Sequence, residues 1–541
     1  MSEEAGRHPG AVIAVQVGRR AARSGAGWGL VFGCFVLAQT LAYTSAYRTG
    51  AERGQMAAAF GTNTGLIALL GPAHAIDTVA GFAAWRELGI LSILGGIWGL
   101  LASTRLIRGE EEAGRYEMLV AGQTTRRRAA AQAVAGLGAG LAALFALTAV
   151  GVVLTGRDAS VRFSVGQSLY FAVTLVAPAA TFLAVGVLSS QLAATRRRAA
   201  AVAGGFFGLC YVLRMVADTD PGLHWMVWLS PLGWIEESRP LTAPRPVALV
   251  PVVLAIGVIV AVALRLAGTR DLGTGSWPGR DASRPRPALA GGPASLAVRL
   301  MRPAATGWLL AVAAFAILLG TVAESSTRDA SGDKSVQQAL GRIGGHSSTV
   351  AAYLGLTFLV LAFMTTLVAA GQITAIRAEE ADGHLENLAV RSVSRTSWLA
   401  GRLLLSACLL VAVGLLAGAA AWAGAAAQHG RVGFGSLVAA GLNIVPPALL
   451  LLGLGALMLG AWPRRTAAIV YAYLAWSFLV EFLGAIVHTS RWLLDSSVFF
   501  HMAPAPATNP DWASAATLAC LAAGAALLGG AFFRRRDLAR E

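Results

Sequence analysis

The chain has 541 residues, of which 56% are hydrophobic and only 13% are charged, and its mean hydropathy is +0.63. A water-soluble protein of this length could not bury so many apolar side chains, so the composition indicates a polytopic membrane protein. The net charge of +15 would suit nucleic-acid binding in a soluble protein. Here the arginines gather at the ends of apolar segments, which the positive-inside rule explains without any nucleic acid.

The apolar segments predict an all-α protein. A membrane-spanning helix needs about 20 mostly apolar residues, and about twelve segments of the chain meet that requirement. The expected spans are 28–47, 84–106, 129–155, 165–190, 199–217, 245–267, 304–322, 349–375, 398–426, 435–461, 466–489 and 512–533.

Arginine placement predicts the orientation of these spans. The triplets Arg126 to Arg128, Arg196 to Arg198 and Arg534 to Arg536 all fall on one side of the membrane if the helices alternate. That side is therefore expected to be cytoplasmic, with both termini on it.

The spans divide into two halves, 1–269 and 304–541. Residues 270–303 are rich in Gly, Pro, Arg and Ser and indicate a cytoplasmic linker. Arginines alternate with apolar residues at 15–23 and 296–302, which predicts a short interfacial helix before each half turns into the bilayer. With six spans each, the halves are expected to form parallel repeats with a pathway between them.

One charged motif occurs twice, at 108–119 and at 377–388, 269 positions apart (379 − 110). Arg, Glu-Glu, Gly, Glu and Leu fall in register, each time after the second span of a half. A solvated helix end would explain one copy, but repetition favours a short helix that receives force from a soluble partner. The residues expected to couple to that partner are Glu110, Glu111, Gly114, Glu117, Leu119, Glu379, Glu380, Gly383, Glu386 and Leu388.

The motif resembles the coupling-helix pattern of ABC-2-type exporter membrane subunits, in which an acidic and basic cluster leads into Gly-x-x-Glu-x-Leu. The duplicated twelve-helix form is similar to the tetronasin-type antibiotic exporters. The resemblance implies a permease in the bacterial cytoplasmic membrane that exports hydrophobic or amphiphilic compounds. It also implies two copies of a separate ATPase, which would hold ATP-Mg. Many members have a proline after the motif, where this chain has Gln123 and Ser392.

The chain itself shows no sign of an ATPase. A P-loop needs a glycine-rich turn that ends in Gly-Lys-Ser/Thr, and Lys334, the only lysine in the sequence, lacks a glycine at the required spacing. The sequence also lacks a metal-ligand cluster and a nucleophile–base pair. We therefore expect a transport subunit that binds no cofactor and is not an enzyme.

Charged side chains inside spans are expensive in lipid and indicate function. Arg214 and Glu481 fall at equivalent positions of the fifth span of each half. They either pair near the pseudo-two-fold axis as a gate or each snorkel to water at the outer boundary. Aromatic residues on the same spans either line a substrate pathway or pack between helices: Phe207, Tyr211, Tyr473, Trp476 and Phe478.

Two other classes of protein fit parts of the sequence. A secondary transporter of parallel-repeat type would have the same topology but needs carboxylates in the membrane, and Glu481 alone is thin support. A membrane-embedded lipid-linked transferase would need clustered acidic or His residues, for which Asp218, Asp220 and His224 are the only hint. Export, rather than import, follows from the family resemblance alone.

Overall fold

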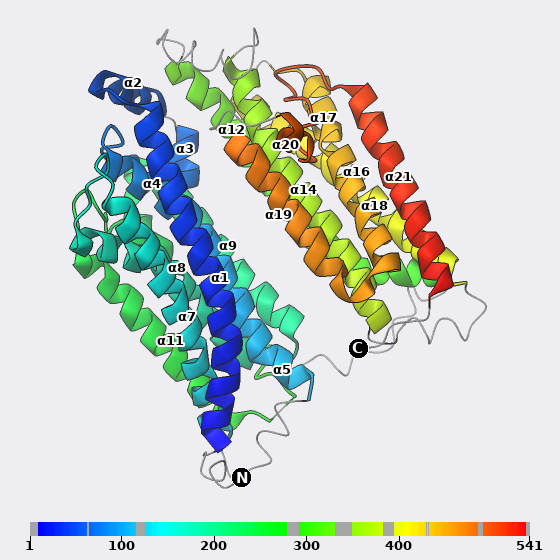
Figure 1. Cartoon of the computed structure of the whole chain (residues 1–541), viewed down its shortest axis with the longest axis horizontal. Helices are drawn as coiled ribbons and strands as arrows, with labels where there is room; N and C mark the ends of the chain where they lie inside the picture. The colour runs from blue at the N-terminus through cyan, green and yellow to red at the C-terminus, as the bar shows by residue number, and fades with distance from the viewer. Residues whose placement is uncertain are drawn as a thin grey trace. The chain divides into compact units, whose positions relative to one another are not determined.

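The computed structural model describes the whole chain except residues 1–8, 62–63, 115–124, 272, 278–291, 331–348, 382, 384–393, 429, 431, 485–490 and 537–541. In the described part every regular element is a helix (Figure 1). The chain divides into two compact units, Met1–Ser283 and Arg284–Glu541. Each unit is described by itself.

The first unit contains the long helices of the first half and several short ones at their ends. Its elements are α1 (Pro9–Ala46), α2 (Gly50–Gly61), α3 (Thr64–Leu70), α4 (Val79–Leu106), α5 (Arg108–Glu112), α7 (Arg126–Gly156), α8 (Val165–Leu192), α9 (Arg196–Thr219), η1 (Pro221–Leu229), α10 (Pro231–Glu236), η2 (Pro246–Leu249) and α11 (Val250–Thr269).

The second unit repeats the order of long helices. Its elements are α12 (Pro293–Ala330), α14 (Thr349–Ala381), α16 (Arg395–Ala427), α17 (Phe434–Asn443), α18 (Val445–Ala461), η3 (Pro463–Arg465), α19 (Thr466–Gly484), α20 (Arg491–Asp495) and α21 (Trp512–Arg535). Helix α1 packs along α7 as α12 packs along α16, and α4 packs on α8 as α14 packs on α18.

Eleven helices of the described residues are long and apolar enough to cross a membrane. They include every expected span except 466–489, and they establish an all-α polytopic membrane protein. The remaining segment forms α19, which has 19 residues in the described part of the chain. A twelfth span at α19 remains a prediction.

Hydroxyl side chains set the beginning of several long helices. The Thr125 hydroxyl accepts from the Arg128 backbone N–H at the start of α7, and the Thr195 hydroxyl accepts from the Arg198 N–H at the start of α9. Ser394 does the same at the start of α16. These N-caps satisfy backbone donors that a helix start leaves free, so each arginine-rich segment enters its helix at a defined residue.

The expected interfacial helices differ from the structure. Residues 15–23 belong to α1 and residues 296–302 belong to α12, and each of these helices runs for 38 residues without a turn. The apolar face at Ile13, Val17 and Ala21 packs in a buried cluster with residues of α7, not against lipid headgroups. Helices α1 and α7 pack so closely that a Cβ on Gly25 would overlap the Gly140 carbonyl oxygen. This close contact favours a straight α1.

The two ends of the first unit are distinct (Figure 1). Near the N-terminal end of α1, the Arg20 guanidinium donates to Glu110 of α5 at 2.8 Å. Near the C-terminal end of α1, the Tyr43 hydroxyl donates to the Ile76 carbonyl at 3.0 Å, in the turn between α3 and α4. The acidic motif and the α2–α3 segment therefore lie at opposite ends of α1.

The contact of α1 with α7 gives a matched pair of variants. Gly25→Ala is expected to lower the free energy of unfolding by about 1–3 kcal/mol, because the added methyl group forces the two helix backbones apart. Gly27→Ala is the control, since a Cβ at Gly27 meets no atom within 4 Å. Denaturant titration of the purified protein in detergent measures both variants. Equal stability of the two would contradict the packing described for α1.

Candidate functional site

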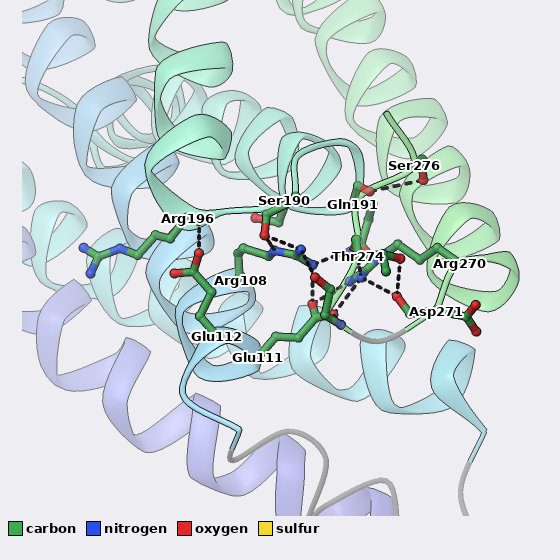
Figure 2. A network of polar contacts seen from close by, with 12 residues as sticks. Arg108, Glu111, Glu112, Ser190, Gln191, Arg196, Arg270, Asp271, Thr274 and Ser276 are labelled. Atoms are coloured by element: carbon green, nitrogen blue, oxygen red, sulfur yellow. Dashed lines mark hydrogen bonds and ion pairs between the residues drawn. The ribbon is translucent and has the colours of Figure 1, made fainter. Parts of the chain in front are cut away.

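Arg108, the first residue of the motif, is completely buried at the start of α5, which follows α4. Its Nε donates to the Ala194 carbonyl at 3.0 Å, and its Nη1 donates to the Thr274 carbonyl at 3.0 Å. Its Nη2 donates to the Gly273 carbonyl at 3.1 Å. Figure 2 shows this guanidinium between the α8–α9 turn and the segment that follows α11. One buried cation therefore joins three parts of the first unit.

Glu111 is the carboxylate that faces this cation. Its Oε2 lies 2.9 Å from Arg108 Nη1, and its two oxygens accept from Arg270 Nη1 and Nη2 at 2.7 and 2.6 Å. The Gly273 N–H also donates to Glu111 Oε1 at 2.8 Å. A bidentate arginine–carboxylate pair of this kind is strong and fixes orientation as well as distance.

The neighbouring glutamates bind other elements. Glu110 accepts from Arg20 of α1 at 2.8 Å, and Glu112 accepts from the Arg196 backbone N–H at 2.8 Å (Figure 2). That N–H is at the first turn of α9, where backbone donors lack helical partners. Three consecutive glutamates therefore connect α5 to α1, to the end of α11 and to the start of α9.

The segment that follows α11 lies across this site. Its Ser276 and Trp277 N–H groups donate to the Gln191 and Leu192 carbonyls at 3.1 and 3.0 Å. Arg270 Nε donates to the Gln191 side chain at 2.8 Å, and Arg126 donates to the Arg270 carbonyl at 2.9 Å. The start of the expected linker is thus an ordered part of the first unit.

The second unit repeats the arrangement with the residues that the duplication places in register. Glu380 accepts from Arg536 Nη1 and Nη2 at 2.6 and 2.8 Å, and Arg377 Nη1 lies 3.8 Å from Glu380 Oε2. Arg377 Nε donates to the Pro463 carbonyl at 3.0 Å, as Arg108 donates to Ala194. We call Arg108, Glu111 and Arg270 the first clasp, and Arg377, Glu380 and Arg536 the second clasp.

The two clasps also share a backbone feature. Gly114 and Gly383 follow α5 and α14 with φ angles of +70° and +73°. A Cβ at either position would meet no atom of the described residues within 4 Å. Glycine suits both positions because of its left-handed conformation, which costs other residues about 1–2 kcal/mol.

The motif differs in one contact between the units. Glu110 binds Arg20 of the first helix of its unit, whereas Glu379 binds Arg402 of α16. Arg402 in turn donates to the Ala297 carbonyl of α12 at 3.2 Å. Glu110 therefore connects the motif to the first long helix of its unit, whereas Glu379 connects it to the third long helix and, through Arg402, to the first.

The predicted coupling residues divide into two groups. Glu111 and Glu380 are 6% and 3% exposed and face into their own units. Glu110, Gly114, Glu379 and Gly383 are described, and none of these four is fully buried. Glu117, Leu119, Glu386 and Leu388 lie outside the described residues. The direct contact with a partner therefore remains a prediction for the whole motif.

The predicted pathway residues of the first unit cluster on α9. Arg214 is 4% exposed and lies 4.9 Å from the ring of Tyr211, and both contact α3. Phe207 packs edge-on against Phe182 of α8 with ring centroids 4.8 Å apart.

The predicted pathway residues of the second unit lie on α19. Trp476 and Phe478 are more than one-third exposed, and Phe478 packs on Phe363 of α14 at 4.6 Å. Tyr473 and Trp476 donate to Ser496, at 3.4 and 2.9 Å. Glu481 is partly buried, and its Oε2 lacks a hydrogen-bond partner among the described residues. Its pairing with Arg214 remains a prediction.

Sequence reasoning missed several polar residues of the site. Glu87 is fully buried in α4 and accepts from the Thr40 hydroxyl at 2.7 Å, although its place within an expected span was a visible signal. Arg270 and Arg536 were visible only as basic residues at the end of the last helix of each half. The residues suggested for a transferase have structural contacts: Asp220 caps η1, and His224 lies 3.7 Å from Glu237.

Eleven spans in two units, with the same clasp at the end of the second long helix of each, are the architecture of a duplicated membrane permease. Residues 16–218 match the model of the ABC-2 family transporter protein. Residues 291–534 match the model described as multidrug efflux system permease Rv1217c, C-terminal domain. Both units of the chain are therefore similar to ABC-2-type exporter permeases, which supports a role in transport.

A curated relative extends the similarity to nearly the whole chain. The multidrug efflux system permease protein Rv1217c of Mycobacterium tuberculosis (strain ATCC 25618 / H37Rv) is 28% identical over 502 residues. The alignment covers 91% of this chain and 88% of the relative. The ABC-2 resemblance of the motif is thus confirmed, and the narrower resemblance to tetronasin-type exporters remains a prediction.

The first clasp can be tested by removing its charge. Glu111→Gln is expected to cost about 3 kcal/mol of unfolding free energy, because it leaves two buried guanidinium groups without the carboxylate charge that compensates them. Asp271→Asn is the control, since the Asp271 side chain is 82% exposed and its pair with Arg126 is screened by solvent. Denaturant titration in detergent compares them. A loss no larger than that of the control would show that the clasp is energetically minor.

Proposed function

We propose that this chain is the membrane subunit of an ATP-driven pump that exports hydrophobic or amphiphilic compounds, including drugs. The similarity to the Mycobacterium relative, a multidrug efflux system permease, supports that substrate class. The lone Lys334 without a P-loop supports an ATPase on separate polypeptides, which would bind ATP-Mg. The chain itself binds no cofactor in this proposal.

Two copies of the ATPase dock, one at each motif. The repetition of the clasp, down to φ angles of +70° at Gly114 and +73° at Gly383, supports two equivalent docking points. The segments 110–125 and 379–394 receive the force when the ATPase dimer closes. The clasps then pass that force to the ends of α11 and α21 and to the turns that precede α9 and α19. The clasp geometry is the observation that carries this proposal, because in each unit it connects the motif to the end of the last helix and to the turn before the fifth long helix.

The arginine pattern supports a location in the bacterial cytoplasmic membrane with both termini and both clasps in the cytoplasm. The substrate leaves by a pathway that includes Phe207, Tyr211, Tyr473, Trp476 and Phe478. Exposed aromatic side chains such as Trp476 supply the apolar surface that an amphiphilic compound needs. Motion of the two halves would open this pathway alternately to each side.

Purification of the full chain from its own cells tests the partner. A polypeptide with a P-loop is expected to co-purify, and inverted membrane vesicles are expected to accumulate a hydrophobic dye when ATP is added. Glu111→Gln combined with Glu380→Gln should reduce ATP-driven dye uptake at least about tenfold, the effect of about 1.4 kcal/mol of lost coupling. Asp271→Asn should leave uptake unchanged.

Two results would contradict this function. One is the absence of any ATPase subunit together with dye uptake that needs no ATP. The other is uptake driven by a proton gradient alone, which would instead establish a secondary transporter.

A further inference from the structure

A second buried charge cluster lies at the opposite end of the first unit from the clasp. Its centre is Arg214 of α9, whose Nη2 donates to the Ala68 and Leu69 carbonyls at 3.0 and 2.9 Å. The Tyr211 hydroxyl donates to the Leu69 carbonyl at 2.8 Å. These carbonyls end α3, where a helix leaves acceptors without partners. Arg214 and Tyr211 therefore hold the end of α3 on α9.

Two carboxylates share this one cation. Asp218 Oδ2 lies 3.4 Å from Arg214 Nε, and Glu236 Oε2 lies 3.5 Å from Arg214 Nη1. Both Asp218 oxygens and Glu236 Oε2 are buried without a hydrogen-bond partner among the described residues. A buried carboxylate without full compensation is strongly disfavoured and tends to bind a proton.

The carboxylate of Glu236 borders a small cavity of about 50 Å³. This volume has room for water, whose molecules need polar partners such as those lining this cavity. Glu236 Oε1 lies 2.6 Å from where a Cβ on Gly71 would be, and Gly71 has a φ of +98°. Only glycine therefore leaves space for the carboxylate at this turn.

The other charged groups near Glu236 pair with one another. Glu237 pairs with Arg239 and Arg245, each at 3.3 Å, and lies 3.7 Å from His224. Arg239 also lines the cavity, but its guanidinium pairs with Glu237.

The remaining walls of the cavity contribute no fixed charge. Burial lowers the pKa of His74, which lines the cavity and is therefore neutral at pH 7. Helix α3 contributes carbonyl groups, and the lining residues of α4 are uncharged. The inner group of Arg214, Asp218 and Glu236 thus has one positive and two negative charges when both acids are ionised.

We propose that this cavity is a proton-binding site, in which a hydronium ion protonates Glu236 and leaves its water in the cavity. Asp218 then remains the single ionised partner of Arg214, and the inner group is neutral. The site goes beyond the transport function proposed above and does not depend on it.

The proton has a definite effect on stability. Glu236 lies in α10, outside the membrane-spanning helices, and burial raises its pKa from 4.5 to about 8. The folded protein therefore binds this proton more tightly than the unfolded chain does. The resulting stabilisation is complete below pH 4.5 and is lost as the pH rises through about 8.

Infrared spectroscopy of the purified full-length protein tests the proposal directly. At neutral pH the C=O stretching band of a protonated carboxylic acid should be present, and it should disappear as the pH passes about 8. Glu236→Gln should abolish that titrating band. Glu237→Gln is the matched control, because Glu237 is the adjacent carboxylate but does not line the cavity, and it should keep the band.

Two outcomes would overturn the proposal. The first is a wild-type protein without an acid band that titrates near pH 8. The second is a Glu236→Gln variant that keeps the band, which would then belong to another buried acid such as Glu87. Thermal unfolding gives a second reading. The melting temperature of Glu236→Gln should fall less between about pH 5 and pH 9 than that of the wild type, and equal falls would also contradict the site.

Discussion

In each unit, a bidentate contact between a buried glutamate and the arginine that follows the last helix joins two distant helix ends. Glu111 with Arg270, and Glu380 with Arg536, connect the end of the second long helix to the end of the final one. Neither charge could be buried alone, because an unpaired ion in a protein interior costs several kcal/mol. The pair therefore holds together two helix ends that are far apart in the sequence, and the neighbouring turns bind to it.

Helix α9 connects the two polar ends of the first unit. Its first turn binds Glu112 of the motif through the Arg196 N–H, and its last turns hold α3 through Arg214 and Tyr211. Few of its residues between these ends are buried. Helix α9 is therefore the element that contacts both the motif and the end of α3.

Much of this fold follows from the sequence. Hydropathy predicted most of the long helices within a few residues, because a span needs a fixed length of apolar chain, although α1 and α12 begin well before the expected residues 28 and 304. The interfacial helix at 15–23 was wrong, because arginine spacing suggests a lipid surface while the contact of Gly25 with Gly140 depends on a helix more than 100 residues later. The sequence pattern of a segment predicts its periodicity but does not identify the segment against which it packs.

The site was predictable to a similar extent. Duplication identified the motif, since two registered copies of a charged pattern are unlike a solvated helix end. The partners were not predictable, because Arg270 and Arg536 are 159 and 156 residues from their glutamates. Arg214 was recognised as costly in lipid, but its second carboxylate, Glu236, comes from a short helix after a turn. Such long-range pairs are decided by packing, which a single sequence does not contain.

A double-mutant cycle on Glu111 and Arg270 measures the central interaction most directly. Each residue is changed to Gln, singly and together, and the free energy of unfolding is compared for all four proteins. The clasp predicts an interaction energy of about 3 kcal/mol, with the double variant hardly less stable than either single one. Additive losses, with an interaction energy below about 0.5 kcal/mol, would show that the two side chains act independently and would contradict the clasp.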